Sequence, residues 1–430
     1  MKRLSPTDLM RFFISPYESW AIRYSSEIDS TIFIKDPENE FLSMAKKKGD
    51  DHEYKILKRY QDEKLSIKMI PDSGPREERL DATKQAMLDG LDIIYQGSLE
   101  NEFFFGKTDF LVKTHGDSNL GNYRYEILDA KLARRAKAEH IIQLSCYREL
   151  LENIQGKVSD SASLIYGDGE LERFNLDNYD SFYKALREKF FNFHASFNPD
   201  NIPDPASYDE WGIYSEYAKN IIQKTNNLSS IAGIRKSQIK KLKEANINSC
   251  EELINSEISK ETKINPKVLD RLKLQAKHQL KSKKNSKLSF EVLPHSERGL
   301  GLKGLPEKSL NDVYFDLESN TFTVPMTLHY LWGFAYEKNS HKKFDCLWAH
   351  TQEDMKEVFE SFVDMLMDKF SEDPKMHVFH YGAFEVTTLK TLAGYFSSKS
   401  DEIDHLLRNN VFIDLFKLVK QSFCIGSTGY

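Results

Sequence analysis

The sequence predicts an α/β protein with more than one domain. The chain has 430 residues, of which 40% are hydrophobic and 12% aromatic, so it can form two or three domains with real cores. Residues 123–132 alternate as a strand does, and helical patterns flank them at residues 44–60 and 139–153. Another strand pattern begins a separate region at residues 312–318. Strands interleaved with helices are typical of a sheet covered by helices.

The helix predicted at residues 44–60 contains the first chemically informative group. Gly49, Asp50 and Asp51 lead directly into His52 and Glu53. An adjacent imidazole and carboxylate can serve one metal site, so His52 and Glu53 are candidate ligands. By itself, however, such a pair on a helix surface is usually solvated.

The two following strands supply the central acids. Gly106 and Asp109 form a G-x-x-D pattern, which we expect to place Asp109 at the end of the first strand. The second strand carries D-x-K at Asp129 and Lys131. Because neighbouring strands lie about 5 Å apart, these three side chains can converge on one hard cation.

Strand alternation decides which acid of the second strand is the better ligand. Ile127, Asp129 and Lys131 share one face, whereas Glu126 and Leu128 share the other. Glu126 is therefore the poorer candidate. A D-x-K triplet alone is weak evidence, because about six (D/E)-x-K triplets arise by chance in a chain this charged.

The helix predicted at residues 139–153 completes the series. Gln143 and Tyr147 are four residues apart and share one helix face, although an ordinary half-buried face would show the same spacing. In this order the four motifs resemble those of the RecB-like nucleases of the PD-(D/E)xK superfamily, over roughly residues 1–200. The resemblance implies a restriction-endonuclease-like core with a mixed sheet flanked by helices.

The resemblance also implies roles for these residues. In such nucleases His52, Asp109, Asp129 and the backbone carbonyl of Ala130 would hold Mg²⁺ or Mn²⁺, and Lys131 would orient or activate the attacking water. The remaining candidates are Gln143 and Tyr147, which would line the site, and Glu53, which would ligate directly or through water. The expected activity is phosphodiester hydrolysis, with DNA favoured over RNA. Cleavage mode, polarity and strandedness stay open.

Many RecB-like nucleases carry an iron–sulfur cluster, and this chain departs from that pattern. The first cluster position would be Ser15, and the other three would fall in residues 202–220, which contain no cysteine. The four cysteines, at positions 146, 250, 346 and 424, form no C-x-x-C pair. We therefore expect no iron–sulfur cluster.

The formal net charge of −6 hides a basic segment. Residues 234–287 hold 15 Lys or Arg against 6 Asp or Glu. Ile231 to Ile234 and the short helices that follow resemble a helix-hairpin-helix, whose glycine turn offers N–H groups to a phosphate. The implied nucleic-acid contacts are Gly233, Lys236, Lys240 and Lys241. A solvated helix pair without a partner is the alternative. Residues 281–287 predict a flexible basic hinge.

The third region begins near residue 300. Asp316 and Glu318 end a strand in D-x-E and share its face, so they can bind one metal pair. A partner strand at residues 327–335 makes a hairpin with it. This strand and residues 378–385 resemble the first two motifs of the RNase H-like DEDD-type 3′–5′ exonucleases, which implies a second candidate metal site at Asp316, Glu318 and Glu385.

This third region departs from its family pattern. Glu385 stands where the family usually has aspartate, and His380 where it often has asparagine. Asp414 fits the end of a strand better than a catalytic position. The third motif is expected beyond Tyr430, so we expect an RNase H-like domain that is incomplete and plays a binding or residual role.

Three domains follow: a RecB-like nuclease at residues 1–205, a basic helical segment at 206–290 and an RNase H-like domain at 291–430. The arrangement resembles prokaryotic nucleases of repair or defence that are often fused to a superfamily-one helicase, so a helicase domain or subunit is an expected partner. The chain has no G-x-x-x-x-G-K-[ST]. It has neither a signal-peptide pattern nor a run of eighteen apolar residues, so we expect a cytoplasmic protein without membrane attachment.

Two other functions remain open on the sequence. One is a non-catalytic nucleic-acid-binding scaffold, whose affinity would fall steeply with salt. The other is a 3′–5′ exonuclease that acts through the DEDD-type region of a longer protein.

Overall fold

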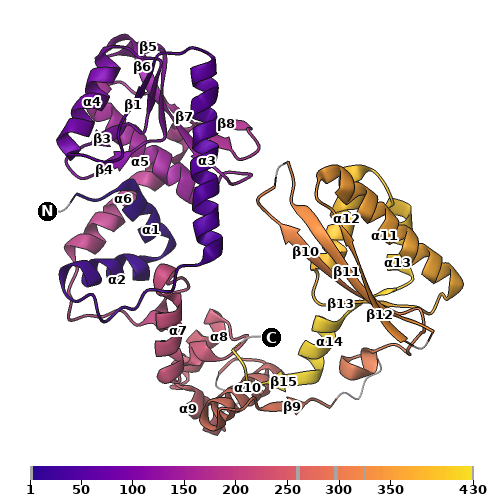
Figure 1. The fold of residues 1–430 in the computed structure, drawn as a ribbon. Coiled ribbons are helices and arrows are strands. Elements are labelled where there is room, and N and C mark those ends of the chain that lie inside the picture. Colours follow the sequence, from indigo (N-terminus) through magenta and orange to yellow (C-terminus); the bar gives the residue numbers. More distant parts are fainter. Residues whose placement is uncertain (1–2, 258–261, 295–298, 324, 340, 429–430) are drawn as a thin grey trace. The chain divides into compact units, whose positions relative to one another are not determined.

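The computed structural model describes residues 3–257, 262–294, 299–323, 325–339 and 341–428, and it divides into two compact units, residues 1–224 and 225–430 (Figure 1). Each unit encloses its own clusters of buried apolar side chains. The division into three domains predicted above stays a prediction. Among the described residues, no helix is both long and apolar enough to cross a membrane.

The first unit combines a mixed sheet with helices on both faces. Its elements are α1 (Pro6–Ile14), α2 (Pro16–Glu27), α3 (Glu40–Asp62), β1 (Ile67–Met69), α4 (Arg76–Leu88), β2 (Ile93–Tyr95), β3 (Ser98–Glu100), β4 (Phe105–Lys107), β5 (Phe110–Ser118), β6 (Gly121–Lys131), α5 (Ala138–Gln155), β7 (Ser161–Tyr166), β8 (Leu171–Asn175), α6 (Asp180–Ala195) and α7 (Ser215–Lys224). The main sheet has the order β1-β2-β5-β6-β7-β8, and β3 pairs with β4 separately. Strands β2, β5 and β6 are antiparallel, whereas β7 is parallel to β6 after the α5 crossover.

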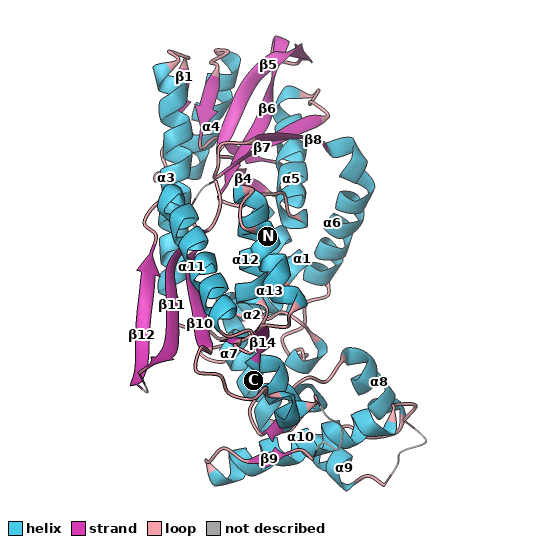
Figure 2. Cartoon of the chain, turned by 90° about the vertical axis from the view of Figure 1, so that its right-hand side faces the viewer, coloured by secondary structure: helices cyan, strands magenta, loops and turns pink. Residues whose placement is uncertain are grey.

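Strand alternation separates the two faces of this sheet. Ile127 belongs to the large cluster formed with α4, α5 and α6, whereas Leu128 packs with Ile56 and Leu57 of α3 on the other face. Figure 2 shows α3 and α5 on either side of the strands. The helices predicted at residues 44–60 and 139–153 are both present, and each extends a few residues further at both ends.

An aromatic cluster joins the amino-terminal helices to the end of the first unit. Tyr17, Trp20 and Tyr24 of α2 surround Phe33, which also contacts Tyr214. All five side chains are buried. The two segments in which the resemblance would place cluster ligands, around position 15 and within residues 202–220, are therefore packed together by aromatic rings.

The second unit contains a helical part and a sheet part. Its elements are α8 (Lys236–Glu244), α9 (Cys250–Asn255), α10 (Pro266–Asn285), β9 (Phe290–Val292), β10 (Val313–Asn320), β11 (Leu328–Lys338), β12 (His341–Trp348), α11 (Gln352–Glu372), β13 (Val378–His380), α12 (Phe384–Phe396), α13 (Ser400–Arg408), β14 (Phe412–Asp414), α14 (Leu415–Ser422) and β15 (Phe423–Ile425). The short helices predicted around the glycine turn are present, with Leu242 and Leu253 in their shared core.

The larger sheet of the second unit has the order β12-β11-β10-β13-β14. Strands β10, β11 and β12 form an antiparallel meander, and β13 and β14 add in parallel, so the predicted hairpin is confirmed. Val313, Phe315 and Leu317 face the core with α11, whereas Asp316 and Glu318 are exposed on the opposite face.

Two expectations about local structure are wrong. Residues 281–287 are not a hinge, because α10 continues to Asn285 and ends only at Ser286, which has a φ of +49°; lysine is a good helix former and its charge suits a helix C-terminus. Asp109 does not end a strand that contains Gly106. The chain leaves β4 after Lys107, Thr108 N–H donates to Gly97 O at 2.9 Å, and β5 starts at Phe110.

Candidate active site

Asp109 and Asp129 meet because β5 and β6 are antiparallel neighbours. The register pairs Phe110 with Leu128, so the residue that precedes β5 lies beside the carboxyl end of β6. The Ala130 backbone N–H donates a 2.8 Å hydrogen bond to Asp109 Oδ2. The sheet thus brings together the two acids that the sequence placed on separate strands.

Lys131 and Asp129 form an ion pair inside this site. Lys131 Nζ lies 2.5 Å from Asp129 Oδ2, and the Asp129 side chain is 1% exposed. Burial alone would lower the pKa of Lys131, but the charges of Asp129 and Asp109 outweigh it and the net shift is upward. Lys131 is therefore a cation that the neighbouring carboxylates hold in its charged form.

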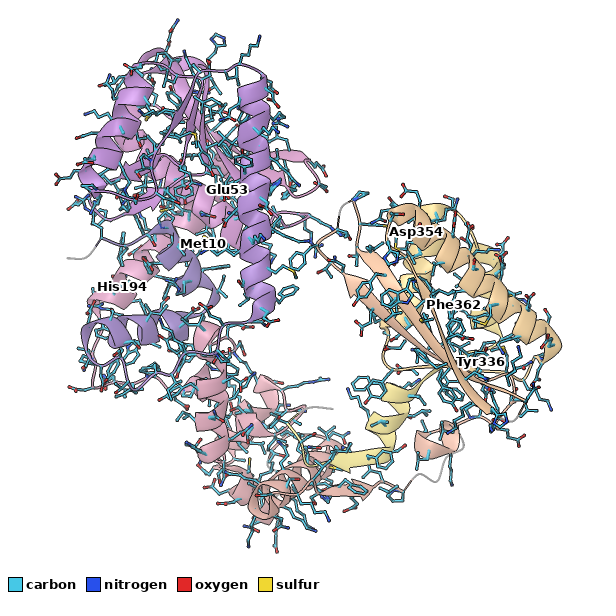
Figure 3. The ribbon with its side chains drawn as sticks, in the orientation of Figure 1. Met10, Glu53, His194, Tyr336, Asp354 and Phe362 are labelled. Carbon is cyan, nitrogen blue, oxygen red and sulfur yellow. The ribbon has the colours of Figure 1, made fainter. Side chains whose placement is uncertain are left out.

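Glu53 reaches the same cluster from α3. Its Oε2 accepts hydrogen bonds from Gln96 Nε2 at 2.7 Å and from Tyr95 Oη at 3.3 Å, and Figure 3 shows it on the side of α3 that faces the sheet. Burial raises the pKa of Glu53, and the charge of Asp129 adds to the shift. Burial and then Glu53 raise the pKa of Tyr95 to about 12, so its hydroxyl stays protonated and donates.

The cluster contains more carboxyl groups than neighbouring cationic side chains. Burial raises the pKa of Asp109 well above its usual range, and the carboxylates of Asp129 and Glu53 raise it further. Lys131 is the ammonium that pairs directly with this cluster, and the charge of Lys107 also acts on Glu53. Like charges in a site poor in water destabilise one another, so this arrangement favours a bound cation.

Helix α5 contributes the predicted glutamine and tyrosine. Gln143 Nε2 donates to Tyr147 Oη at 3.1 Å, and Tyr147 Oη donates to Lys107 O at 2.6 Å. Burial raises the pKa of Tyr147 far above its usual range, and Asp129 and Asp109 contribute. Tyr147 is thus a neutral donor that ties α5 to the chain just before Asp109.

His52 is placed differently from its neighbour Glu53. Its Nε2 lies 3.2 Å from the backbone oxygen of Ile165 on β7. A carbonyl can only accept, so Nε2 carries the proton and Nδ1 is the nitrogen with a free lone pair. Ile165 pairs with Ala130 of β6, so this contact places His52 beside the strand that carries Asp129 and Lys131.

Three residues near the cluster were not predicted from the sequence. Tyr95 and Gln96 hold Glu53, and His140 lies close enough for Lys131 to act on it: burial lowers the pKa of His140, and the Lys131 charge lowers it further. His140 precedes Gln143 by one helical turn, so helix periodicity could have identified it. Tyr95 and Gln96 required knowledge of the strand pairing.

The unpaired atoms of this cluster suit a hard divalent ion. Asp129 Oδ1, Gln143 Oε1 and Gln96 Oε1 are buried and lack a hydrogen-bond partner in the described part of the chain. All three are oxygen atoms, and oxygen atoms are the ligands that Mg²⁺ and Mn²⁺ prefer. No three His, Cys, Asp or Glu side chains among the described residues stand ready to hold one metal, but Mg²⁺ is commonly bound through one or two carboxylates plus water. The residues therefore fit such an ion.

The second candidate site lies on the sheet of the second unit. Asp316 and Glu318 are exposed, and Glu385 is buried in the first turn of α12. Burial raises the pKa of Glu385, the charge of His380 lowers it, and that of Asp316 raises it. Glu385 Oε2 lies 3.6 Å from His380 Nδ1. The structure thus brings Glu385 within electrostatic range of Asp316.

Asp414 serves as a cap in this unit. Its Oδ1 accepts hydrogen bonds from Phe416 N–H at 2.9 Å and from Gly382 N–H at 3.0 Å. The carboxylate therefore stabilises the start of α14 and the loop before α12. Asp414 ends β14, as expected.

Gly233 lies in the turn before α8. Gly233 adopts a φ of +79°, a conformation that favours glycine, and it is exposed together with Lys236, Lys240 and Lys241. Lys241 Nζ donates to the carbonyl of Lys263 at 3.0 Å. Lys241 is thus already engaged with the chain itself.

Comparison with known protein families gives a match in the sheet part of the second unit. Residues 313–429 match the family model of the RNase H superfamily, in agreement with the meander followed by parallel strands. No curated protein gives a match to the chain. The RNase H superfamily match indicates a nuclease-type activity and a nucleic acid substrate.

Proposed function

We propose that the chain is a metal-dependent nuclease that hydrolyses phosphodiester bonds, preferably of DNA, at the site of Glu53, Asp109, Asp129 and Lys131. The observation that carries this proposal is the convergence of three carboxylates and one ammonium at the meeting point of β5, β6 and α3. Asp129 is buried there, and Glu53 and Asp109 are half-buried. The arrangement of α3, three antiparallel strands, α5 and a parallel strand also supports a PD-(D/E)xK core.

The residues of the chain would divide the chemistry as follows. Asp109, Asp129 and His52 would hold Mg²⁺ or Mn²⁺ together with the backbone carbonyl of Ala130, and Glu53 would act directly or through water. The bound ion would polarise the phosphoryl oxygen and lower the pKa of the attacking water. Lys131 would hold that water and balance charge that develops in the transition state.

Helix α5 and its tether would orient the same machinery. Tyr147 donates to the carbonyl of Lys107, so it fixes the chain two residues before Asp109. The amide NH₂ group of Gln143 donates to the Tyr147 hydroxyl. The amide oxygen of Gln143 would then accept a hydrogen bond from the substrate or from bound water. Removing either side chain should therefore disturb the position of Asp109 and leave the charge of the site unchanged.

Cleavage assays test this proposal. Labelled single- and double-stranded DNA and RNA would be incubated with the full chain and Mg²⁺ or Mn²⁺. We expect Asp129→Ala and Lys131→Ala to lower the cleavage rate by about 100-fold or more, the usual effect of losing a group that stabilises transition-state charge.

The control is Glu126→Gln. Glu126 lies on the same strand and pairs with Arg173 at 2.9 Å, away from the carboxylate cluster, so this variant should cleave at the wild-type rate. If wild type and both site variants cleave equally, the proposed site is wrong.

A second candidate function is exonuclease activity at Asp316, Glu318 and Glu385. The RNase H superfamily match and the interaction of Glu385 with Asp316 favour it. Asp316→Ala and Asp129→Ala separate the two sites: cleavage that survives Asp129→Ala and is lost in Asp316→Ala would assign the reaction to the second unit.

The glycine turn and helix α8 would then bind the nucleic acid substrate. Their exposed Gly233, Lys236, Lys240 and Lys241 suit phosphate contacts that carry no sequence preference. If the chain were only a scaffold, it would bind nucleic acid in a salt-dependent manner and show no metal-dependent cleavage.

A further inference from the structure

Gln96 occupies an unusual backbone position next to the carboxylate cluster. It follows the last residue of β2 and has a φ of +60°, in the left-handed region that few residues other than glycine adopt. Its N–H donates to the carbonyl of Asp109 at 2.9 Å. A residue kept in this conformation beside a functional site is a candidate for a functional role.

The side chain of Gln96 connects two elements that the sequence keeps far apart. Its Nε2 donates to Glu53 Oε2 at 2.7 Å, and Tyr95 Oη donates to the same oxygen at 3.3 Å. Through its backbone and its amide together, Gln96 therefore links Asp109 to the carboxylate that α3 contributes.

The other end of the same amide is unsatisfied. Gln96 Oε1 is buried and has no hydrogen-bond partner among the residues that the structure describes. When Glu53 is ionised, as a metal site requires, the NH₂ group must face it, because a flipped amide would turn its oxygen toward a carboxylate oxygen. A buried acceptor without a partner costs free energy, unless a donor that belongs to the working site completes it.

We propose that Gln96 is a positioning residue of the metal site: its NH₂ group fixes the Glu53 carboxylate, and its amide oxygen accepts a hydrogen bond from water bound to Mg²⁺ or Mn²⁺. This inference rests on the proposed function, because it requires a cation between Glu53, Asp109 and Asp129. It adds a residue to that site which none of the four sequence motifs contains.

Mn²⁺ binding to the full chain tests this role without relying on activity. Titration calorimetry, or the loss of the free Mn²⁺ signal in electron paramagnetic resonance, would give the dissociation constant. We expect Gln96→Ala to weaken Mn²⁺ binding by about 10-fold or more, the range typical of residues that orient metal ligands.

The matched control is Gln85→Ala. Gln85 also donates from Nε2 to a carboxylate, Asp89 Oδ1 at 2.8 Å, but it is exposed on α4. Its loss should leave the Mn²⁺ dissociation constant unchanged. Gln96→Asn is a second variant, because asparagine tolerates the left-handed backbone well and its shorter amide cannot reach Glu53 in the same way.

The outcomes separate this inference from the proposed function. If wild type binds Mn²⁺, Asp129→Ala does not, and both Gln96 variants bind as tightly as wild type, the role of Gln96 is wrong and the site stands. If wild type itself binds no Mn²⁺, the metal site fails as a whole. If the Gln96 variants lower the melting temperature of the metal-free protein and leave Mn²⁺ affinity unchanged, Gln96 has only a structural role.

Discussion

At the residue scale, the first unit gathers three acids, of which Asp129 is buried and Glu53 and Asp109 are half-buried. Glu53, Asp109 and Asp129 share one cluster with Lys131, and the pKa values of Glu53 and Asp109 are raised mainly by burial. Folding without a bound cation therefore raises the affinity of these two acids for a proton. The clustered acids therefore destabilise the metal-free fold, and a bound cation would relieve this cost.

This charge imbalance predicts how the stability of the metal-free protein depends on pH. A raised folded-state pKa contributes stability below the unfolded pKa of about 4, and that contribution is lost as the pH rises through the folded pKa. Asp109→Asn cannot ionise, so we expect it to be more stable than wild type at pH 8. At pH 4 the gain should vanish.

Urea unfolding with a chelator present, at pH 4 and pH 8, measures this difference. Asp117→Asn is the control, because Asp117 is an exposed acid on the same strand β5, and it should follow wild type at both pH values. An Asp109→Asn advantage that is equal at the two pH values would contradict the prediction.

At the scale of elements, helix-capping side chains link the amino-terminal helices of the first unit to its carboxyl-terminal segment. Ser15 separates α1 from α2: its Oγ accepts from Glu18 N–H at 3.0 Å and donates to Glu210 O at 2.7 Å. One hydroxyl therefore caps α2 and holds a segment 195 residues away. Asp36 acts in the same way at α7, where it accepts from Ser215 and Glu216 N–H.

We expect Ser15→Ala to destabilise the first unit by about 1–2 kcal/mol, since it removes a helix cap and a buried hydrogen bond. Thermal unfolding followed by circular dichroism measures the change. Ser26→Ala, in which an exposed hydroxyl loses a bond to Arg23 O, should change the melting temperature little. Equal effects of the two substitutions would mean that the link to Glu210 contributes nothing.

At the scale of the whole molecule, the chain has separate cores. Buried clusters of the first unit lie within residues 1–224, and those of the second within residues 225–430. The RNase H superfamily match covers only the sheet part of the second unit. Two candidate carboxylate sites therefore lie on two independently packed bodies.

Separate cores predict that each unit unfolds on its own. Phe362 is fully buried and stacks on Phe315 at 4.3 Å between ring centroids, and Figure 3 labels it between α11 and the sheet. In scanning calorimetry, Phe362→Leu should lower one transition by several degrees, and Ser15→Ala should lower another. A single transition that both variants shift equally would contradict independent unfolding.

Much of the fold and of the candidate site could be predicted from local patterns. Alternation along residues 123–132 separated Asp129 and Lys131 from Glu126, which pairs with Arg173 and Arg124 instead. Spacing by four placed Gln143 and Tyr147 together on α5. These predictions succeeded because strand and helix periods are fixed by backbone geometry and need no tertiary information.

Long-range pairing could not be predicted in this way. Asp109 lies beside Asp129 because β5 and β6 are antiparallel, although it precedes β5 rather than ending a strand. Gln96 and Tyr95 meet Glu53 only because β2 lies next to β5 beneath α3. The predicted hinge at residues 281–287 is wrong, because the lysines of this segment extend α10 to Asn285.

The sequence by itself determined the strands, the helices and which side chains share a face, since these depend on residues a few positions apart. Only the tertiary structure decided which acids become neighbours, which hydrogen bonds hold them and how far burial raises their pKa values. The physical reason is that desolvation and charge interaction act through space, between residues such as Glu53 and Asp129 that the chain separates widely.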